Sequence, residues 1–141
     1  MNDFERLIKI LDVDLTKVFI QTVDENDDYL TLLIDSQLDK GKDGSNKNIR
    51  PLYTQGYKNY KSKRGGVVDR VNLKLTNEYR SSRRYKYGEY YVESFHENNE
   101  DLAQILVNRY GADIEQLSPQ NEELFIKRIF DQFMRNAFGD L

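Results

Sequence analysis

The sequence predicts an α+β fold in which a small curved antiparallel sheet with a tyrosine-rich hairpin packs against helices. Three observations lead to this prediction. Apolar and polar residues alternate in two runs between Asp69 and Phe95, which is typical of strands. A polar break separates the runs. Apolar residues recur at helical spacing on both sides of the stretch, and from Ser118 onward they form a C-terminal amphipathic helix.

A chain of 141 residues suits a single domain. We divide it into an N-terminal helical part with a polar loop (1–48), a basic tyrosine-rich sheet region (49–97) and C-terminal helices (98–141). With 38% hydrophobic and 32% charged residues, the composition is polar for a compact domain. Part of the apolar surface is therefore expected to serve neighbouring subunits.

Several classes of function are disfavoured by composition. The chain has no cysteine and one histidine, His96, so disulfides, thiolate metal sites and multi-histidine sites are excluded within it. We expect no cofactor. The N-terminus lacks the features of a signal peptide, and no apolar run approaches the roughly 20 residues needed to cross a bilayer. We expect a soluble protein made in the cytoplasm.

The first 38 residues predict helices. An apolar stripe at i, i+3, i+4 and i+7 spacing indicates a short amphipathic helix capped by Asn2 or Asp3, and its members are Phe4, Leu7, Ile8 and Leu11. The run 17–23 fits a strand or a helix, and we favour a helix. The acidic cluster at 24–28 suits a helix N-terminus, which predicts a further helix over 25–38.

The glycine-rich segment 39–48 predicts an exposed loop. Asp39 and Asp43 stand where an EF-hand places calcium ligands. However, Gly41 and Arg50 occupy the third and twelfth positions, which require ligand oxygens. We therefore interpret the segment as a loop without a metal site.

Three tyrosines at helical spacing, Tyr53, Tyr57 and Tyr60, stand among lysines. They fit either the buried face of a short helix with hydroxyls at its rim or a stacking surface for nucleic-acid bases. We favour burial. Gly56 weakens the helix prediction.

Alternation over 68–75 predicts a half-exposed strand, followed by one helical turn capped by Thr76 or Asn77. The segments 83–87 and 89–95 then predict a hairpin that turns at 88–89. His96 follows directly. We expect it at the surface or leading into the next helix rather than acting as a general base, because no second histidine or cysteine can assist it.

Two helices are predicted in the C-terminal part. Asn98 or Asn99 caps the first, which stops at Gly111. Ser118 followed by Pro119 is typical of the start of the second. The apolar stripe of this last helix consists of Leu124, Phe125, Ile129, Phe130, Phe133 and Ala137.

Charge is strongly segregated along the chain. The net charge is -3, yet residues 47–86 contain twelve Lys or Arg against two acidic residues, which leaves about -13 for the remainder. A basic middle between acidic ends can bind nucleic acid, meet an acidic partner or join copies head to tail, and it also fits simple charge balance. The candidate subunit or DNA-facing interface comprises Lys58, Lys61, Lys63, Arg64, Arg80, Arg83, Arg84, Tyr85 and Tyr87.

Three segments carry a resemblance to a known family. Residues 73–82, LKLTNEYRSS, resemble a recurring segment of leucine, threonine, glycine, an acidic or small residue, an aromatic or leucine, and serine. Residues 49–60 are similar to an isoleucine, proline, tyrosine, threonine stretch, and 118–133 to a closing helix. The family is that of small neck and tail-completion proteins of tailed bacteriophages, of the type found in phages of gut anaerobes. Asn77 stands where the family has glycine, and asparagine tolerates positive φ better than most residues.

The resemblance covers roughly residues 49–138. It implies a curved sheet on helices, assembled as a homo-oligomeric ring in the virion neck beside portal, adaptor or tail proteins. It also implies no enzymatic activity and a location in the virion after synthesis in the host cytoplasm. Segregated charge fits a ring, whose subunits present two different surfaces to each other. Contact with passing DNA would be transient and non-specific.

Two other functions remain in competition. A stand-alone nucleic-acid-binding protein would use the tyrosines, lysines and arginines of 53–87 and would bind with strong salt dependence. An enzyme is the less favoured alternative. Carboxylates such as Glu93 and Glu97 are plentiful, but the sequence marks none as buried beside a partner that would perturb its pKa.

Overall fold

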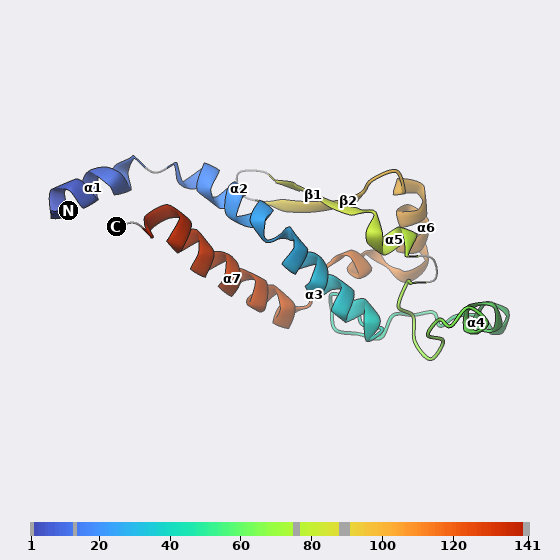
Figure 1. Ribbon diagram of the computed structural model, residues 1–141. Helices are drawn as coiled ribbons and strands as arrows, with labels where there is room; N and C mark the ends of the chain where they lie inside the picture. Colours follow the sequence, from blue (N-terminus) through green and yellow to red (C-terminus); the bar gives the residue numbers. More distant parts are fainter. Residues whose placement is uncertain (1, 13, 75–76, 88–90, 140–141) are drawn as a thin grey trace.

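The computed structural model describes residues 2–12, 14–74, 77–87 and 91–139 (Figure 1). The predicted α+β fold is confirmed. Its elements are α1 (Asp3–Leu11), α2 (Leu15–Glu25), α3 (Asp27–Asp39), α4 (Gln55–Ser62), α5 (Glu78–Ser81), β1 (Arg83–Tyr87), β2 (Val92–His96), α6 (Glu100–Tyr110), the 3-10 helix η1 (Ala112–Glu115) and α7 (Pro119–Phe138). Leu75, Thr76 and the predicted turn at 88–89 lie outside the described residues, as does the side chain of Leu11.

Helices α2 and α3 form a nearly continuous rod along which α7 packs (Figure 1). The Asp14 side chain caps α2 by accepting from the Lys17 N–H at 3.1 Å, so the ambiguous run 17–23 is helical. Asn26 separates the two helices with φ −118° and ψ 12°. Its side-chain amide donates to the Thr22 carbonyl and to Gln132 of α7, each at 2.7 Å. The helix predicted from residue 25 therefore begins at Asp27.

The hydrophobic core is built around α3. Leu30, Ile34 and Leu38 pack there against residues from five other segments: Ile49, Tyr53, Val71, Leu73, Tyr79, Ala103 and Ile114. Leu38 is fully buried. Because burying a Leu or Ile side chain contributes about 1.5–3 kcal/mol, this cluster supplies much of the driving force for folding.

The strand predicted over 68–75 is wrong for its described part, which forms no strand. Val71, Asn72 and Leu73 are all buried instead of alternating, and Leu73 has a φ of 58°. The backbone N–H groups of Asn72 and Leu73 donate to the Tyr53 hydroxyl at 3.2 and 3.3 Å. A buried tyrosine thus supplies the acceptor that a neighbouring strand would have supplied.

Helix α5 begins after Asn77, whose φ is 66°. This left-handed conformation is the one that asparagine was expected to tolerate in place of glycine. Asn77 occupies the N-cap position, but its side chain makes no capping hydrogen bond.

The predicted hairpin is confirmed, with a register that differs from the one a two-residue turn at 88–89 implies. Tyr85 pairs with Ser94 and Tyr87 with Val92, so the connection spans 88–91 and the second strand begins at Val92. A two-residue turn at 88–89 would have paired Tyr87 with residue 90, two positions before its observed partner Val92. The inner face of β1 lies against α3, because the Tyr85 hydroxyl lies 2.7 Å from the Thr31 hydroxyl. Helix α3 therefore covers the face of β1 that carries Tyr85, a residue of the predicted interface.

The last helix begins and ends as predicted. The Ser118 hydroxyl accepts from the Asn121 N–H at 3.3 Å, Pro119 is the first helical residue, and Gly139 is the C-cap. Its apolar stripe is incompletely covered. Ile129 is buried, whereas Phe130 is 61% exposed.

Gln37 joins α3 to the start of α7. Its side-chain nitrogen donates to the Gln116 carbonyl at 3.0 Å. Its side-chain oxygen accepts from the Ser118 N–H at 2.7 Å and from the Asn121 amide at 2.8 Å. Gln37 is 5% exposed, so water cannot readily replace these partners.

We predict that Gln37→Leu lowers the free energy of unfolding by about 1–3 kcal/mol, because it leaves the buried Ser118 N–H without its acceptor. Denaturant unfolding followed by circular dichroism measures the change. Gln104→Leu is the matched control, since Gln104 donates to Asn108 on the exposed side of α6 and its loss should change stability by less than about 0.5 kcal/mol. Equal effects of the two substitutions would refute the role given to Gln37.

Candidate interaction surface

Three members of the predicted basic interface lie inside the protein. Lys61 is 0% exposed, and Arg80 and Arg83 are each 4% exposed. A side chain that is enclosed by its own chain cannot contact DNA or a second subunit. For these three residues the predicted interface role is therefore replaced by a structural one.

Lys61 fastens the 71–74 segment to α4. Its ammonium lies 3.0 Å from the Tyr53 hydroxyl, 2.5 Å from the Asn72 side-chain oxygen and 4.4 Å from the centroid of the Tyr53 ring. Burial, with a smaller contribution from the charge of Arg80, lowers the pKa of Lys61 to about 8. Among the described residues it forms no salt bridge, so neutral hydrogen-bond partners and an aromatic face surround the amine.

Arg80 and Arg83 fasten the base of the hairpin to α3. The Arg80 guanidinium lies 2.7 Å from the Asp39 carboxylate and 3.3 Å from that of Asp35. Arg83 lies 3.2 Å from the same Asp35 carboxylate. Its Nε and Nη2 have no hydrogen-bond partner among the described residues. The two arginine side chains are enclosed, whereas the Asp35 and Asp39 side chains are 30% and 56% exposed. Removing Asp35 would leave the buried Arg83 guanidinium without the carboxylate that it pairs with, so these contacts hold the base of the hairpin on α3.

Of the other predicted interface residues, the lysines and arginines face solvent wholly or in part, and the two hairpin tyrosines contact α3. Lys63, Arg64 and Arg84 are exposed and Lys58 is half-buried. The Arg64 guanidinium lies 3.5 Å from the centroid of the Tyr60 ring, and Arg84 pairs with Glu97 at 3.2 Å. Tyr85 and Tyr87 direct their hydroxyls to Thr31 and Asp27 of α3.

His96 lies in a buried network, so of the two expected positions, at the surface or leading into the next helix, the second holds. It is 2% exposed and its ring stacks on Tyr79, with centroids 4.5 Å apart. It does lead into the next helix, because its N–H donates to the Glu100 carboxylate at 2.9 Å. Side chains alternate along β2, so His96 lies on the same face as Val92 and Ser94. This alternation could have predicted from the sequence that His96 points inward.

The two ring nitrogens of His96 face different acceptors. Nδ1 lies 2.9 Å from the Tyr79 carbonyl oxygen and 3.0 Å from the Ser82 hydroxyl. Nε2 lies 3.0 Å from the Glu115 carboxylate. A neutral imidazole donates through one nitrogen only, so the tautomer decides whether the ring donates to the carbonyl or to the carboxylate.

A serine, a histidine and a glutamate in contact invite comparison with a hydrolase triad. A triad needs a ring nitrogen that is free to take the serine proton. Here Nδ1 faces the Tyr79 carbonyl, and the Ser82 hydroxyl donates to the same carbonyl at 2.9 Å. Ser82 is also buried. The arrangement stabilises the junction of α5, β2 and η1 and leaves no activated nucleophile.

Glu115 is the acidic member of this network. Burial alone would raise its pKa, but hydrogen bonds from His96 and Tyr79 outweigh burial and hold the pKa below its ordinary value. Burial and the neighbouring Glu115 carboxylate raise the pKa of the Tyr79 hydroxyl. Tyr79 therefore donates to Glu115 as a neutral phenol.

A large apolar groove lies between α2 and α7, with Val92 of β2 at one side. Its volume is about 550 Å³. It is lined by Leu15, Thr16, Phe19, Val23, Val92, Phe125, Ile126, Ile129, Phe130 and Phe133. Leu15 is 50% exposed and Ile126 is 58% exposed. A concentration of large apolar side chains in contact with water is typical of an interaction surface.

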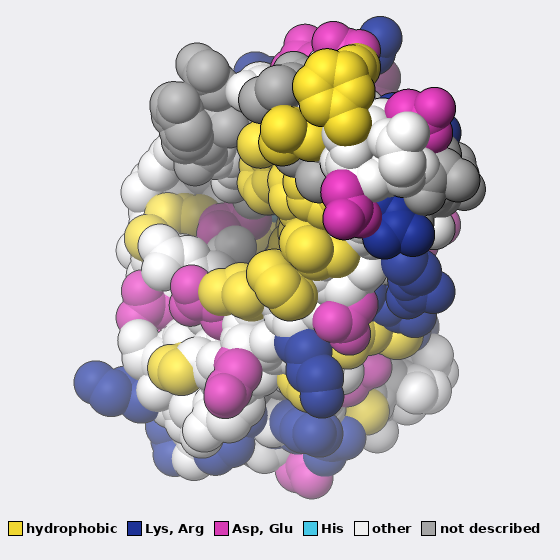
Figure 2. Space-filling view, turned by 90° about the vertical axis from the view of Figure 1, so that its left-hand side faces the viewer, with side chains coloured by type: hydrophobic (Ala, Val, Ile, Leu, Met, Phe, Trp, Pro, Cys, Tyr) yellow, Lys and Arg dark blue, Asp and Glu magenta, His cyan; other side chains and the backbone are white. Residues whose placement is uncertain are grey.

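Figure 2 views the molecule from the end at which α1 and the last turns of α7 lie. Hydrophobic side chains gather there in a continuous band. Phe4 and Leu7 of α1 are 69% and 50% exposed, so the uncovered apolar surface includes α1 as well as the groove.

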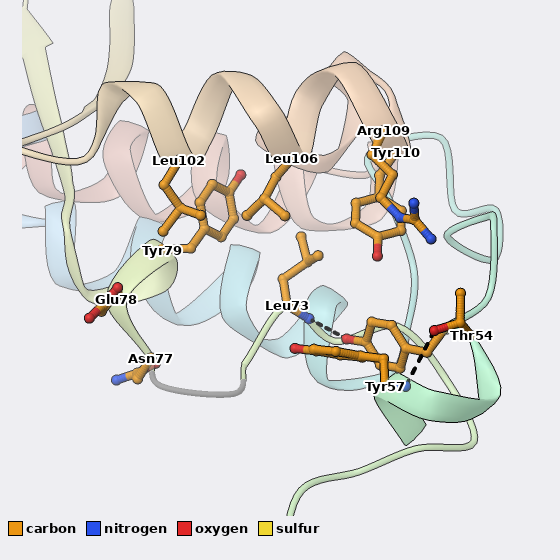
Figure 3. A pocket seen from close by; sticks show the side chains of 11 residues that line it. Thr54, Tyr57, Leu73, Asn77, Glu78, Tyr79, Leu102, Leu106, Arg109 and Tyr110 are labelled. Carbon is orange, nitrogen blue, oxygen red and sulfur yellow. Dashed lines mark hydrogen bonds between the residues drawn. The ribbon is translucent and has the colours of Figure 1, made fainter. Parts of the chain in front are cut away.

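A second pocket, of about 480 Å³, lies between α4, α5 and α6 (Figure 3). Leucines from α6 and from the 71–74 segment form its floor, and tyrosine rings and Arg109 stand around it. The Tyr53 and Tyr57 rings are 4.9 Å apart and inclined by 60°. This pocket suits a small aromatic or aliphatic group with a polar edge.

The described residues contain no group of three or more His, Cys, Asp or Glu that could hold a metal ion. In the loop 39–48, the Asp43 carboxylate accepts from the backbone N–H groups of Ser45 and Lys47 at 2.9 and 3.0 Å, so it shapes the turn. None of the described helices combines the length and the apolar character needed to cross a membrane.

Comparison of the chain with protein-family models, with curated proteins and with solved structures gives no match.

We predict that Glu115 contributes stability that acid removes. Its pKa is depressed in the folded protein, so the contribution is complete above the unfolded-state pKa of roughly 4.3 and is lost as pH falls through the folded-state value. Glu115→Gln should therefore be less stable at neutral pH and should lose less stability on acidification. Thermal unfolding between neutral and acidic pH tests this, and parallel profiles for the two proteins would contradict it.

We predict the opposite dependence for Lys61. Its pKa in the folded protein, about 8, is below its unfolded-state value, so the unfolded chain binds more protons and stability should rise between about pH 8 and 10. Lys61→Met keeps the length of the side chain and should abolish that rise. Lys63→Met, at an exposed position of the same segment, is the control and should retain it.

Proposed function

We propose that this chain is a structural subunit of a protein assembly, and specifically a bacteriophage virion protein of the head-to-tail connector or tail-completion class that forms a ring in the neck. The observation that carries the proposal is the uncovered apolar groove between α2 and α7. The predicted basic interface contributes less, because Lys61, Arg80 and Arg83 are enclosed within the subunit.

The free energies of burial and association favour a large protein contact in the groove over a small ligand. Full burial of a Leu, Ile or Phe side chain contributes about 1.5–3 kcal/mol, so a half-exposed one such as Ile126 recovers roughly half of that. Association of two proteins costs about 4–15 kcal/mol in lost freedom. Several groove residues must be covered together, which an element of another protein can do.

The family resemblance adds the identity of the assembly. In the segment 73–82 the family has glycine where Asn77 stands, and Asn77 has the positive φ of 66° that a glycine would favour. The proposal therefore places the chain in the virion neck, beside portal, adaptor or tail proteins. It requires neither a catalytic activity nor a cofactor.

One observation favours nucleic-acid binding as a second candidate. Tyr60 of α4 is 45% exposed and the Arg64 guanidinium covers one of its faces, with Lys63 exposed nearby. Exposed aromatic rings flanked by cations can stack on unpaired bases while contacting phosphates. This candidate uses α4 and the two residues that follow it, a smaller surface than the block that the sequence predicted.

We predict that the purified protein forms a closed ring, or is recruited onto a portal complex, and that this association persists at moderate salt because apolar contact drives it. Light scattering at low and moderate salt, followed by imaging, measures both. A monomer that ignores neck proteins under all these conditions would refute the proposal.

The second candidate has its own signature. Its affinity for single-stranded DNA should fall with a log-log slope of about −0.7 per neutralised phosphate as salt rises. Replacement of Lys58, Lys63 and Arg64 by Glu should abolish that binding. The same variant should still associate with its own copies if the groove forms the contact.

A further inference from the structure

We infer that α1 of one copy occupies the α2–α7 groove of a neighbouring copy, so that subunits join head to tail through an exchanged helix. This inference deepens the proposed function, on which it rests, by naming both surfaces of the subunit contact. It is carried by the pairing of an uncovered apolar helix with an uncovered apolar groove in the same chain.

Helix α1 presents one apolar face to solvent. Phe4, Leu7 and Ile8 follow the i, i+3, i+4 spacing that places side chains on the same side of a helix, and they are 69%, 50% and 44% exposed. Figure 1 shows α1 projecting beyond the end of α2, away from the body of the molecule. Its own chain thus leaves the apolar face uncovered.

Hydrogen bonds within α1 favour its helical conformation, but the helix needs contact with another surface to be stable. The Asn2 side chain accepts from the Glu5 N–H at 2.8 Å, and the Glu5 carboxylate accepts from the Asn2 N–H at 3.1 Å, which is a reciprocal cap. A helix of nine residues is nevertheless marginal in water, because isolated helices shorter than about 12–15 residues rarely persist. Packing of its apolar face is the contribution that would complete its stability.

The dimensions of helix and groove agree. Along α2 the groove extends from Leu15 to Val23, and along α7 from Phe125 to Phe133. Eight steps of about 1.5 Å make each wall roughly 12 Å long, and a helix of nine residues is about as long. The crevice between two packed helices is also a common docking site for a third amphipathic helix, which inserts side chains at i, i+3 and i+4.

The direction of α1 favours a neighbour over its own groove. The groove begins at Leu15, directly after Asp14, and Asp14 is held by its cap to the Lys17 N–H. To enter its own groove, α1 would have to reverse its direction within residues 12–14. In the structure it continues outward instead, where a second copy can receive it (Figure 1).

The geometry of such a contact extends to a ring. Helix and groove are different surfaces, so each copy donates α1 to one neighbour and accepts α1 from another. A contact of this kind forms a ring if the rotation between successive copies closes, and an open filament if it does not. By contrast, an α7-to-α7 contact between two grooves would be self-complementary and would stop at a dimer.

Two variants that each lack one surface test the inference. Leu7→Glu with Ile8→Glu removes the donated face, and Ile126→Glu with Phe130→Glu removes the receiving groove. All four positions are 44–61% exposed, and circular dichroism with thermal unfolding verifies that each variant folds. Each variant alone should be monomeric by light scattering. An equimolar mixture should double in mass, because the intact α1 of one variant enters the intact groove of the other.

Engineered cysteines identify which chain supplies the helix, since the natural chain contains none. Leu7→Cys with Phe130→Cys should oxidise to a ladder of linked chains. The control pair, Leu7→Cys with Leu124→Cys, places the second thiol on an exposed part of α7 outside the groove and should cross-link much less.

The outcomes separate this inference from the proposed function. A wild-type assembly whose mixed variants stay monomeric, or which survives loss of the α1 face, overturns the inference and leaves the assembly role standing. A wild-type monomer with the disulfide closed inside one chain shows that α1 covers its own groove. A wild-type monomer without either cross-link, which also ignores neck proteins, overturns both.

Discussion

Buried polar contacts along α3 are the constraint on which the rest of this structure depends. Asp35 and Asp39 receive Arg80 and Arg83 from the base of the hairpin, and Gln37 between them holds the start of α7. The side chains of both arginines are nearly inaccessible to water, so each guanidinium depends on these carboxylates. One helix thereby fixes the positions of two elements that are far apart in sequence.

This arrangement explains how a polar sequence makes a core and still leaves apolar surface uncovered. Tyr53, Lys61 and Asn72 satisfy each other and the 71–74 backbone inside the protein, so an irregular segment takes the place of a strand. The His96 and Glu115 pair fixes the junction of the hairpin with η1 in the same way. Apolar side chains of α1, α2 and α7 nevertheless remain at the surface. Figure 2 shows hydrophobic side chains gathered in a band at that end of the molecule.

Local signals predicted much of the fold. Ser118 and Pro119 fixed the start of α7, and alternation predicted the hairpin, because caps and periodicity act within a few residues. The sequence did not predict the register of the hairpin or the irregular conformation of the 68–74 segment. Both depend on partners distant in sequence, such as the Tyr53 hydroxyl. Of the candidate site, the basic residues were identified by charge alone, and charge gives no information on burial.

By itself, the sequence determined the α+β class, the ends of α7 and the apolar stripe of α1, since these follow from the order of neighbouring residues. The tertiary structure decided which polar residues are internal and where uncovered apolar side chains meet. Lys61 and Lys63 look equivalent in sequence, yet one is enclosed and the other faces water. The groove likewise exists only because α7 packs along α2, which brings residues about a hundred positions apart to one surface.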